Sequence, residues 1–154
     1  MKALVVYDSV SARKLTMKVA ETISDVLKER GIEVDCLFTK DVDPATVRSY
    51  DCLVAGSPTM FFRATSGIME FLNSFQDKEF SGKQAAAFDT QLKGRFYGNA
   101  AKGIESKLRK LGFKIVSPPL ITYVEGKTDQ IHLKEGELEK AKKYAEDLAN
   151  KLHP

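Results

Sequence analysis

Apolar residues recur along the chain with two different spacings, and the order of those spacings predicts the fold class. Residues 2–7, KALVVY, form an almost continuous apolar run, which is typical of a strand buried on both faces of a parallel sheet. In the next segment apolar residues recur every three or four positions, which indicates one face of a helix, and Gly31 supplies its C-terminal stop. This helix is predicted over 12–30, with a buried face made of Ala12, Leu15, Val19, Ile23 and Val26.

Strand and helix patterns continue to alternate toward the C-terminus. The fifth strand is interrupted by Pro118 and Pro119, and since a double proline cannot donate ladder hydrogen bonds, we expect this strand at an edge of the sheet. A short helix is predicted where Pro44 follows Asp43. The remaining strands are predicted over 33–39, 51–56, 84–89 and 113–124, and the remaining amphipathic stripes cover 68–75, 101–111 and 138–152.

Five strands that alternate with helices predict an α/β fold of three layers, in which helices cover both faces of a parallel sheet. We expect a doubly wound, five-stranded sheet of strand order 2-1-3-4-5 in a single domain over 1–154, a length that suits one hydrophobic core. Ligands bind such sheets beyond the carboxyl ends of the strands, where the strand order reverses. The loops after strands one, three and four are therefore the candidate functional segments.

Composition narrows the class of protein. The 24 Lys and Arg residues against 21 acids give a net charge of +3, and they lie on helix faces that also carry acids, so nucleic-acid binding has little support. No apolar run has the length of a membrane span and no secretory signal is recognisable, which predicts a cytoplasmic protein. Cys36 and Cys52 lie in strand-like segments and are interpreted as structural thiols, and no metal site is expected.

Loop one, residues 8–16, combines hydroxyl groups with the start of a helix. Ser9, Ser11 and Thr16 supply the hydroxyls, and the unpaired N–H groups of a helix N-terminus favour an anion. A phosphate group therefore fits this loop. The alternative, weighed equally, is that Ser9 or Ser11 simply caps the helix.

Loop two, residues 56–67, presents large apolar side chains directly after a strand. Met60, Phe61 and Phe62 need something to cover them, and a planar aromatic ligand would do so by stacking. The alternative is that one phenylalanine folds back into the core.

Loop three, residues 89–101, again places aromatic residues at this edge. Phe96 and Tyr97 lie beside glycines, which let the backbone approach a ligand closely. Asp8 and Asp89 end strands one and four and are interpreted as turn or cap carboxylates rather than general acids. Together the three loops predict a site for a flat ring system that carries a phosphate on a tether.

The sequence resembles the flavodoxins over nearly its whole length. The most specific feature is Gly56-Ser57-Pro58-Thr59 followed by aromatic residues and a helix, and the segments TMKVAETI from Thr16 and KLRKLGF from Lys107 agree with it. The resemblance implies a flavodoxin-like fold, an FMN cofactor, and electron transfer to a redox partner protein, with no membrane and no nucleic acid involved. It also implies a monomer or a weak homodimer.

By resemblance, loop one would bind the FMN phosphate and loops two and three would hold the isoalloxazine ring. Phe61 or Phe62 is the candidate for one ring face and Phe96 or Tyr97 for the other, with the backbone around Met60 near the flavin N5. No catalytic side chain is implied. The residues expected to contact FMN are Ser9, Val10, Ser11, Ala12, Arg13, Lys14, Thr16, Pro58, Thr59, Met60, Phe61, Phe62, Asp89, Thr90, Gln91, Phe96, Tyr97 and Gly98.

Loop one departs from the family pattern. Ala12 stands where flavodoxins usually have a glycine, and two additional residues separate Ser11 from Thr16. The backbone cradle for the phosphate must therefore be built differently, and Arg13 and Lys14 are candidates for neutralising the phosphate.

Loop three departs from the family in the sign of its charge. Many flavodoxins surround the flavin with acids, whereas Lys93 and Arg95 are the charged residues between Asp89 and Lys102. Cations favour the negatively charged reduced ring, which predicts a less negative potential for the second electron. Redox titration of wild type and of Lys93→Ala/Arg95→Ala tests this expectation, and equal potentials would remove it.

Three other functions are compatible with this fold. An FMN-dependent reductase of quinone-type acceptors would need a nicotinamide site, and the sequence has no GxGxxG motif to supply one. A receiver-type signalling domain would need an aspartate at the end of strand three, where Gly56 and Ser57 stand. A protein-interaction module that has lost FMN is the third, because of Ala12 and the lengthened loop one.

Overall fold

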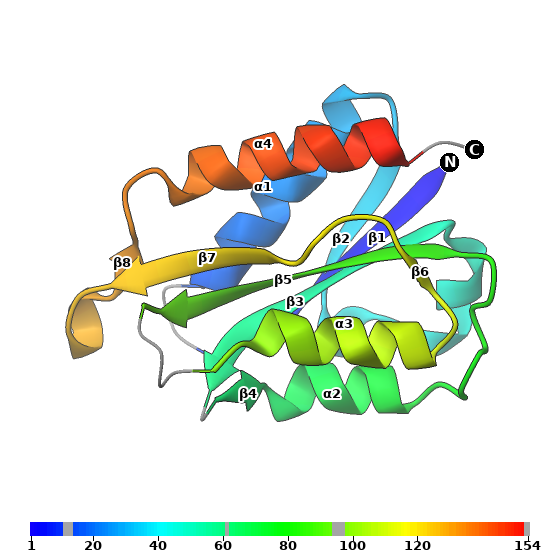
Figure 1. Ribbon diagram of the computed structural model, residues 1–154, viewed down its shortest axis with the longest axis horizontal. Coiled ribbons are helices and arrows are strands. Elements are labelled where there is room, and N and C mark those ends of the chain that lie inside the picture. The colour runs from blue at the N-terminus through cyan, green and yellow to red at the C-terminus, as the bar shows by residue number, and fades with distance from the viewer. Residues whose placement is uncertain (11–13, 61, 94–97, 153–154) are drawn as a thin grey trace.

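Helices cover both faces of a central, mainly parallel sheet (Figure 1). The computed structural model describes residues 1–10, 14–60, 62–93 and 98–152. Within them the strands are β1 (Lys2–Tyr7), β2 (Glu33–Phe38), β3 (Cys52–Met60), β4 (Arg63–Ala64), β5 (Gln84–Leu92), β6 (Lys114–Ile115), β7 (Leu120–Glu125) and β8 (His132–Leu133). The helices are α1 (Leu15–Glu29), α2 (Ser66–Asn73), α3 (Ala100–Lys110) and α4 (Glu137–Lys151), with 3-10 turns η1 (Thr39–Asp41), η2 (Pro44–Ser49) and η3 (Thr128–Gln130).

The strand order of the sheet is β2-β1-β3-β5-β7-β8. The first five of these strands run parallel, which confirms the predicted order 2-1-3-4-5 and the three-layer α/β fold. The short strands β4 and β6 pair with β3 and β5. β8 runs antiparallel to β7 and pairs Leu133 with Val124. The expectation of a fifth strand lying at the edge is therefore correct only for the first part of β7.

Two hydrophobic cores lie on the two faces of the sheet. Along β1, Ala3 and Val5 face α1 and α4, whereas Leu4 and Val6 face α2 and α3. All four side chains are fully buried, as the continuous apolar run predicts for a central parallel strand. Burying each of the larger ones contributes about 1.5–3 kcal/mol.

Two central strands are longer than the sequence pattern indicates. β3 continues past Gly56 to Met60, and β5 continues past Asp89 to Leu92. Pro58 is tolerated in β3 because β1 ends opposite Gly56 and β4 pairs with β3 only from Thr59, so that Pro58 itself has a strand partner on the β5 side only. The first residues of loops two and three are consequently held rigidly by the sheet.

The start of α1 also differs from the prediction. The helix begins at Leu15 rather than at residue 12, and Lys14 before it has a left-handed backbone with φ 52°. Residues 12 and 13 lie outside the described part of the chain. None of the described helices combines the length and the apolar character needed to cross a membrane.

Side-chain exposure corrects two smaller expectations. Leu138 is 37% exposed and does not join the buried stripe of α4. Cys36 is only half-buried because β2 is an edge strand, whereas Cys52 in β3 is buried. Burial raises the pKa of both thiols to about 12, which keeps them protonated and supports their interpretation as structural residues.

Candidate functional site at the carboxyl edge of the sheet

A cavity of about 150 Å³ opens at the carboxyl ends of β1, β3, β5 and β7. It lies at the predicted position, where the strand order reverses between β1 and β3. Its walls combine hydroxyl groups with apolar side chains. The lining residues are Ser9, Val10, Leu15, Thr16, Pro58, Thr59, Met60, Thr90, Gln91, Leu92, Val124 and Ile131.

A buried pair of hydroxyl groups connects the first turn of α1 to the end of β5. Thr16 Oγ1 and Thr90 Oγ1 are 2.9 Å apart, and both side chains are almost inaccessible to solvent. Each hydroxyl can donate one hydrogen bond and accept two, so both retain hydrogen-bonding capacity. This pair fixes the position of the α1 N-terminus relative to the sheet.

The first turn of α1 receives no hydrogen bond from a capping side chain among the described residues. Ser9 does not cap the helix, since its hydroxyl accepts no hydrogen bond from the first turn of α1, and Ser11 lies outside the described residues. As far as the described residues go, the helix N-terminus keeps backbone N–H groups and a partial positive charge for another acceptor.

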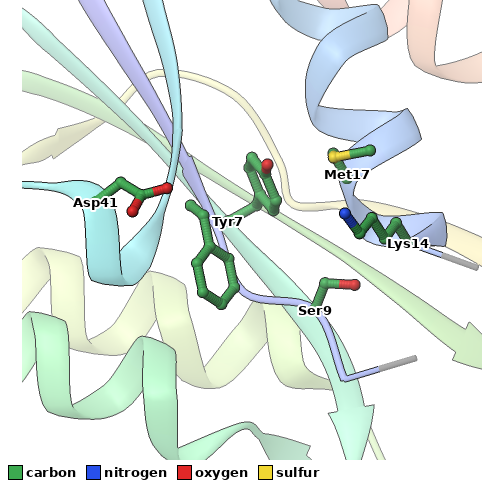
Figure 2. Close-up of a pocket in the computed structure, with 6 residues that line it drawn as sticks. Tyr7, Ser9, Lys14, Met17 and Asp41 are labelled. Atoms are coloured by element: carbon green, nitrogen blue, oxygen red, sulfur yellow. The ribbon is translucent and has the colours of Figure 1, made fainter. Parts of the chain in front are cut away.

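A second hollow of about 280 Å³ lies on the β2 side of α1 (Figure 2). Figure 2 shows Lys14 and Met17 reaching it from α1 and Asp41 from the opposite side, with Tyr7 and Ser9 between them. Lys14 lines this hollow and is absent from the walls of the first cavity. Burial raises the pKa of Tyr7, and the acidic groups of Cys36, Glu21 and Asp41 raise it further.

Asp8 lies beneath loop two and supports the start of α2. Its carboxylate accepts hydrogen bonds from the Ser9 N–H and from Thr65 Oγ1. Thr65 is the N-cap of α2, and its hydroxyl accepts from the Ile68 N–H at 3.4 Å. A side chain at Gly67 would place its Cβ 2.4 Å from Asp8 Oδ2, so any larger residue there would displace the Asp8 carboxylate.

Asp89 lies beneath loop three and supports the start of α3. Its Oδ2 accepts from the Ala101 N–H at 3.1 Å, from Gln91 Nε2 at 2.9 Å and from Thr59 Oγ1 at 3.3 Å. Thr59 in turn accepts from the Ala100 N–H at 3.0 Å. Burial nevertheless raises the pKa of Asp89, because these donors only partly replace water around the charge. Asp8 and Asp89 thus act as cap carboxylates, as interpreted from sequence.

Loops two and three meet directly through their backbones. Phe62 and Gly98 form a bridge, and both have positive φ angles near 71°. A Cβ at Gly98 would lie 2.3 Å from the Phe62 carbonyl oxygen, so the close approach of the two loops requires glycine. The Phe62 side chain is 63% exposed and does not fold into the core.

The structure brings together eight of the predicted contact residues around the cavity. Four others lie beside it without lining it: Lys14 faces the second hollow, Asp89 lies beneath the wall, and Phe62 and Gly98 form the junction of the loops. The eight are Ser9, Val10, Thr16, Pro58, Thr59, Met60, Thr90 and Gln91. The predicted contacts Ser11, Ala12, Arg13, Phe61, Phe96 and Tyr97 lie outside the described residues, as does Arg95.

Four lining residues were missed by sequence reasoning. Leu15 starts α1 and Leu92 ends β5, and both line the cavity. An apolar residue at such a position next to a predicted contact segment was the signal that could have indicated them. Val124 and Ile131 come from the end of β7 and the loop behind it. The strand order alone could have indicated them, because β7 ends at the same edge as β5.

Comparisons with known proteins agree with this architecture. The family model described as Flavodoxin matches residues 5–144. A flavodoxin from the domain Archaea shares 23% identity at a TM-score of 0.75, covering 98% of both chains. Flavodoxin 2 from Bacillus cereus shares 21% identity at a TM-score of 0.82, covering 99% of this chain and 100% of that one.

The same domain also matches part of a larger protein. The rubredoxin:oxygen oxidoreductase of Desulfovibrio gigas shares 19% identity at a TM-score of 0.75, with 97% of this chain aligned to 35% of that chain. Among curated protein sequences none matches significantly. Because the family model spans most of the sequence, the chain belongs to the flavodoxin family.

Proposed function

We propose that this chain is an electron carrier that binds FMN at the carboxyl edge of its sheet. The observation that carries the proposal is the cavity between β1, β3 and β5, which combines hydroxyl groups, apolar walls and a helix N-terminus that no described side chain caps. Membership of the flavodoxin family supports it. Bound FMN would supply the redox chemistry, because the protein itself offers binding, orientation and electrostatics.

The start of α1 suits the phosphate end of the cofactor. Its N–H groups lack a side-chain cap among the described residues, and the helix dipole favours an anion at this point. Ser9 and Thr16 add hydroxyl groups that can donate hydrogen bonds. The donors that the described residues supply are therefore neutral, and Lys14 lines the separate hollow on the β2 side of α1.

The walls formed by loops two and three suit a planar apolar ring. Met60 and Leu92 line the cavity and remain partly exposed, which leaves apolar surface for a ring to cover. Four hydrogen bonds hold these loops in one arrangement. They join Thr59, Asp89 and the first N–H groups of α3, and Gln91 donates one of the four. A preformed site loses less entropy when it binds a ligand.

Titration of the purified protein with FMN tests the proposal directly. We expect quenching of flavin fluorescence at a ratio of one FMN per chain, together with stabilisation against urea of about 2.7 kcal/mol at a hundredfold excess of FMN over Kd. Riboflavin, which lacks the phosphate, should bind at least about tenfold more weakly. Equal binding of the two ligands would contradict the role of the α1 N-terminus.

A pair of threonine variants sharpens this test. Thr16→Val removes a hydroxyl from the cavity wall, and we expect FMN to bind roughly tenfold more weakly. Thr22→Val on the outer part of α1 removes a hydroxyl that bonds only the Lys18 carbonyl, and it serves as the matched control. If the protein takes up no FMN at all, the electron-carrier proposal fails and the interaction-module alternative replaces it.

A further inference from the structure

Exposed apolar side chains gather at the mouth of the cavity. Val10, Met60, Phe62 and Leu92 are 55%, 39%, 63% and 38% exposed, and three of them also line the cavity. In the described part of the chain the other large apolar side chains with comparable exposure are Met1 and Leu138, which belong to other regions. Such a concentration of apolar surface, rimmed by polar residues, marks an interaction site.

The charges beside this apolar surface are positive. Arg63 follows Phe62 and lines a shallow depression together with Val10 and Met60, and Lys93 follows Leu92. Both cations are exposed, whereas the carboxylate of loop three, Asp89, is fully buried. We name the surface formed by Val10, Met60, Phe62, Arg63, Leu92 and Lys93 the carboxyl-edge patch.

Two described acidic residues, Glu125 and Asp129, lie at the end of β7 and in the segment that follows it. Glu125 is engaged with His132 Nε2 at 3.3 Å, and the exposed Asp129 is accompanied by the exposed Lys127. Neither carboxylate belongs to the carboxyl-edge patch, in which the described charged residues are the cations Arg63 and Lys93 beside an apolar centre.

We propose that the carboxyl-edge patch is the docking surface for an acidic electron-transfer protein, whose carboxylates surround its own redox centre. The inference rests on the proposed electron-carrier function, since it names the partner of that site. Complementary charge raises association rates and orients the encounter, while like charges disfavour the wrong partner. An apolar centre with a charged rim has the organisation of a protein interface.

Two forms of one probe protein separate the possible partners. Cytochrome c carries many exposed lysines, and succinylation converts their amines to carboxylates, so the same haem protein can be offered with either sign of charge. Binding is followed by amide shifts of the labelled chain, with and without added FMN. We expect the succinylated form to bind at least about tenfold more tightly at low ionic strength, and the preference to fade as salt screens the charges.

Charge-reversed variants locate the interaction. Arg63→Glu and Lys93→Glu should each weaken binding of the succinylated probe about threefold to tenfold. Lys114→Glu makes the same charge change in β6, beside the opposite end of β5, and should change binding less than about twofold. Amide shifts should centre on Met60, Phe62 and Leu92.

The outcomes distinguish this inference from the function on which it rests. Tighter binding of native cytochrome c, amide shifts on another face, or equal effects of Lys93→Glu and Lys114→Glu would overturn the docking surface even if FMN binds. If the chain takes up no FMN but still binds the succinylated form at the patch, the electron-carrier proposal fails and the docking surface stands.

Discussion

The helices α1, α2 and α3 follow loops one, two and three at the carboxyl edge of the sheet, and the start of α1 differs from the starts of α2 and α3. The N-termini of α2 and α3 are capped by Thr65 and Asn99, with Asp8 and Asp89 placed behind the caps. The N-terminus of α1 follows a left-handed Lys14 and has no side-chain cap among the described residues. All three helices carry the same partial positive charge at this end.

The starts of these helices differ in what lies beside their N–H groups. At α2 and α3 the anion is internal, because a buried carboxylate takes the place that a ligand could occupy. At α1 no carboxylate of the described residues takes the corresponding place, and the helix start adjoins the cavity through Ser9 and Thr16. The carboxylates beneath α2 and α3 hold loops two and three, and the start of α1 is the place to which the proposed function assigns the phosphate.

We expect the largest loss of stability when the buried carboxylate beneath the start of α3 is removed. Asp89→Ala deprives the Ala101 N–H, the Gln91 amide and the Thr59 hydroxyl of a buried acceptor, so the free energy of unfolding should fall by about 3 kcal/mol or more. Urea denaturation measures the change. Asp43→Ala, which removes an exposed cap from η2, is the control and should cost about 1 kcal/mol. Similar losses in the two variants would contradict the importance of the buried carboxylate.

The contact between loops two and three gives the next largest effect. Gly98→Ala forces a Cβ against the Phe62 carbonyl and a left-handed backbone on alanine, which should reduce stability by about 2 kcal/mol. It should also weaken FMN binding, because the two walls must move apart. Gly103→Ala is the matched control, since Gly103 lies in α3 with nothing within 4 Å of its added Cβ. That variant should gain about 0.5–1 kcal/mol, and a loss comparable to that of Gly98→Ala would show that the loop contact is unimportant.

Much of this architecture follows from sequence because its elements depend on local patterns. The continuous apolar runs of the central strands and the three-to-four spacing of the helices indicate the elements and layers, and their alternation predicts the doubly wound strand order. The ends of β3 and β5 could not be obtained in this way. Ser57–Met60 contains a proline and has the composition of a loop, and only its pairing with β5 makes it a strand.

The candidate site was predictable in its position but not in its internal connections. The switch in strand order and the hydroxyl-rich loop one locate the cavity. The bond between Thr16 and Thr90 joins residues far apart in sequence, so no local pattern indicates it. The same holds for the buried acceptors Asp8 and Asp89, whose partners come from other loops.

A smaller effect is expected on the pH dependence of stability. It tests whether ionising the buried Asp89 lowers the free energy of unfolding. Because burial raises its pKa in the folded state above the value near 3.9 of the unfolded chain, the folded protein binds the proton more tightly. The contribution of Asp89 to stability therefore falls as pH rises from that value through the raised pKa, by at most about 1.4 kcal/mol per pH unit. The difference in unfolding free energy between wild type and Asp89→Asn should decrease over this window and then level off. A difference that increases with pH would reverse the assignment.

The smallest effect is expected at the open start of α1, where Lys14 adopts a left-handed backbone with φ 52°. Lys14→Gly relieves that strain and should raise the free energy of unfolding by about 0.5–1 kcal/mol, measured in urea without FMN. Lys14→Ala also removes the charge but keeps the Cβ, so it should give no such gain. Because Lys14 lines the hollow on the β2 side, both variants should retain FMN affinity within about threefold. A loss of tenfold or more in both would mean that the Lys14 ammonium supplements the helix N-terminus, and α1 would then hold its anion with a side-chain charge after all.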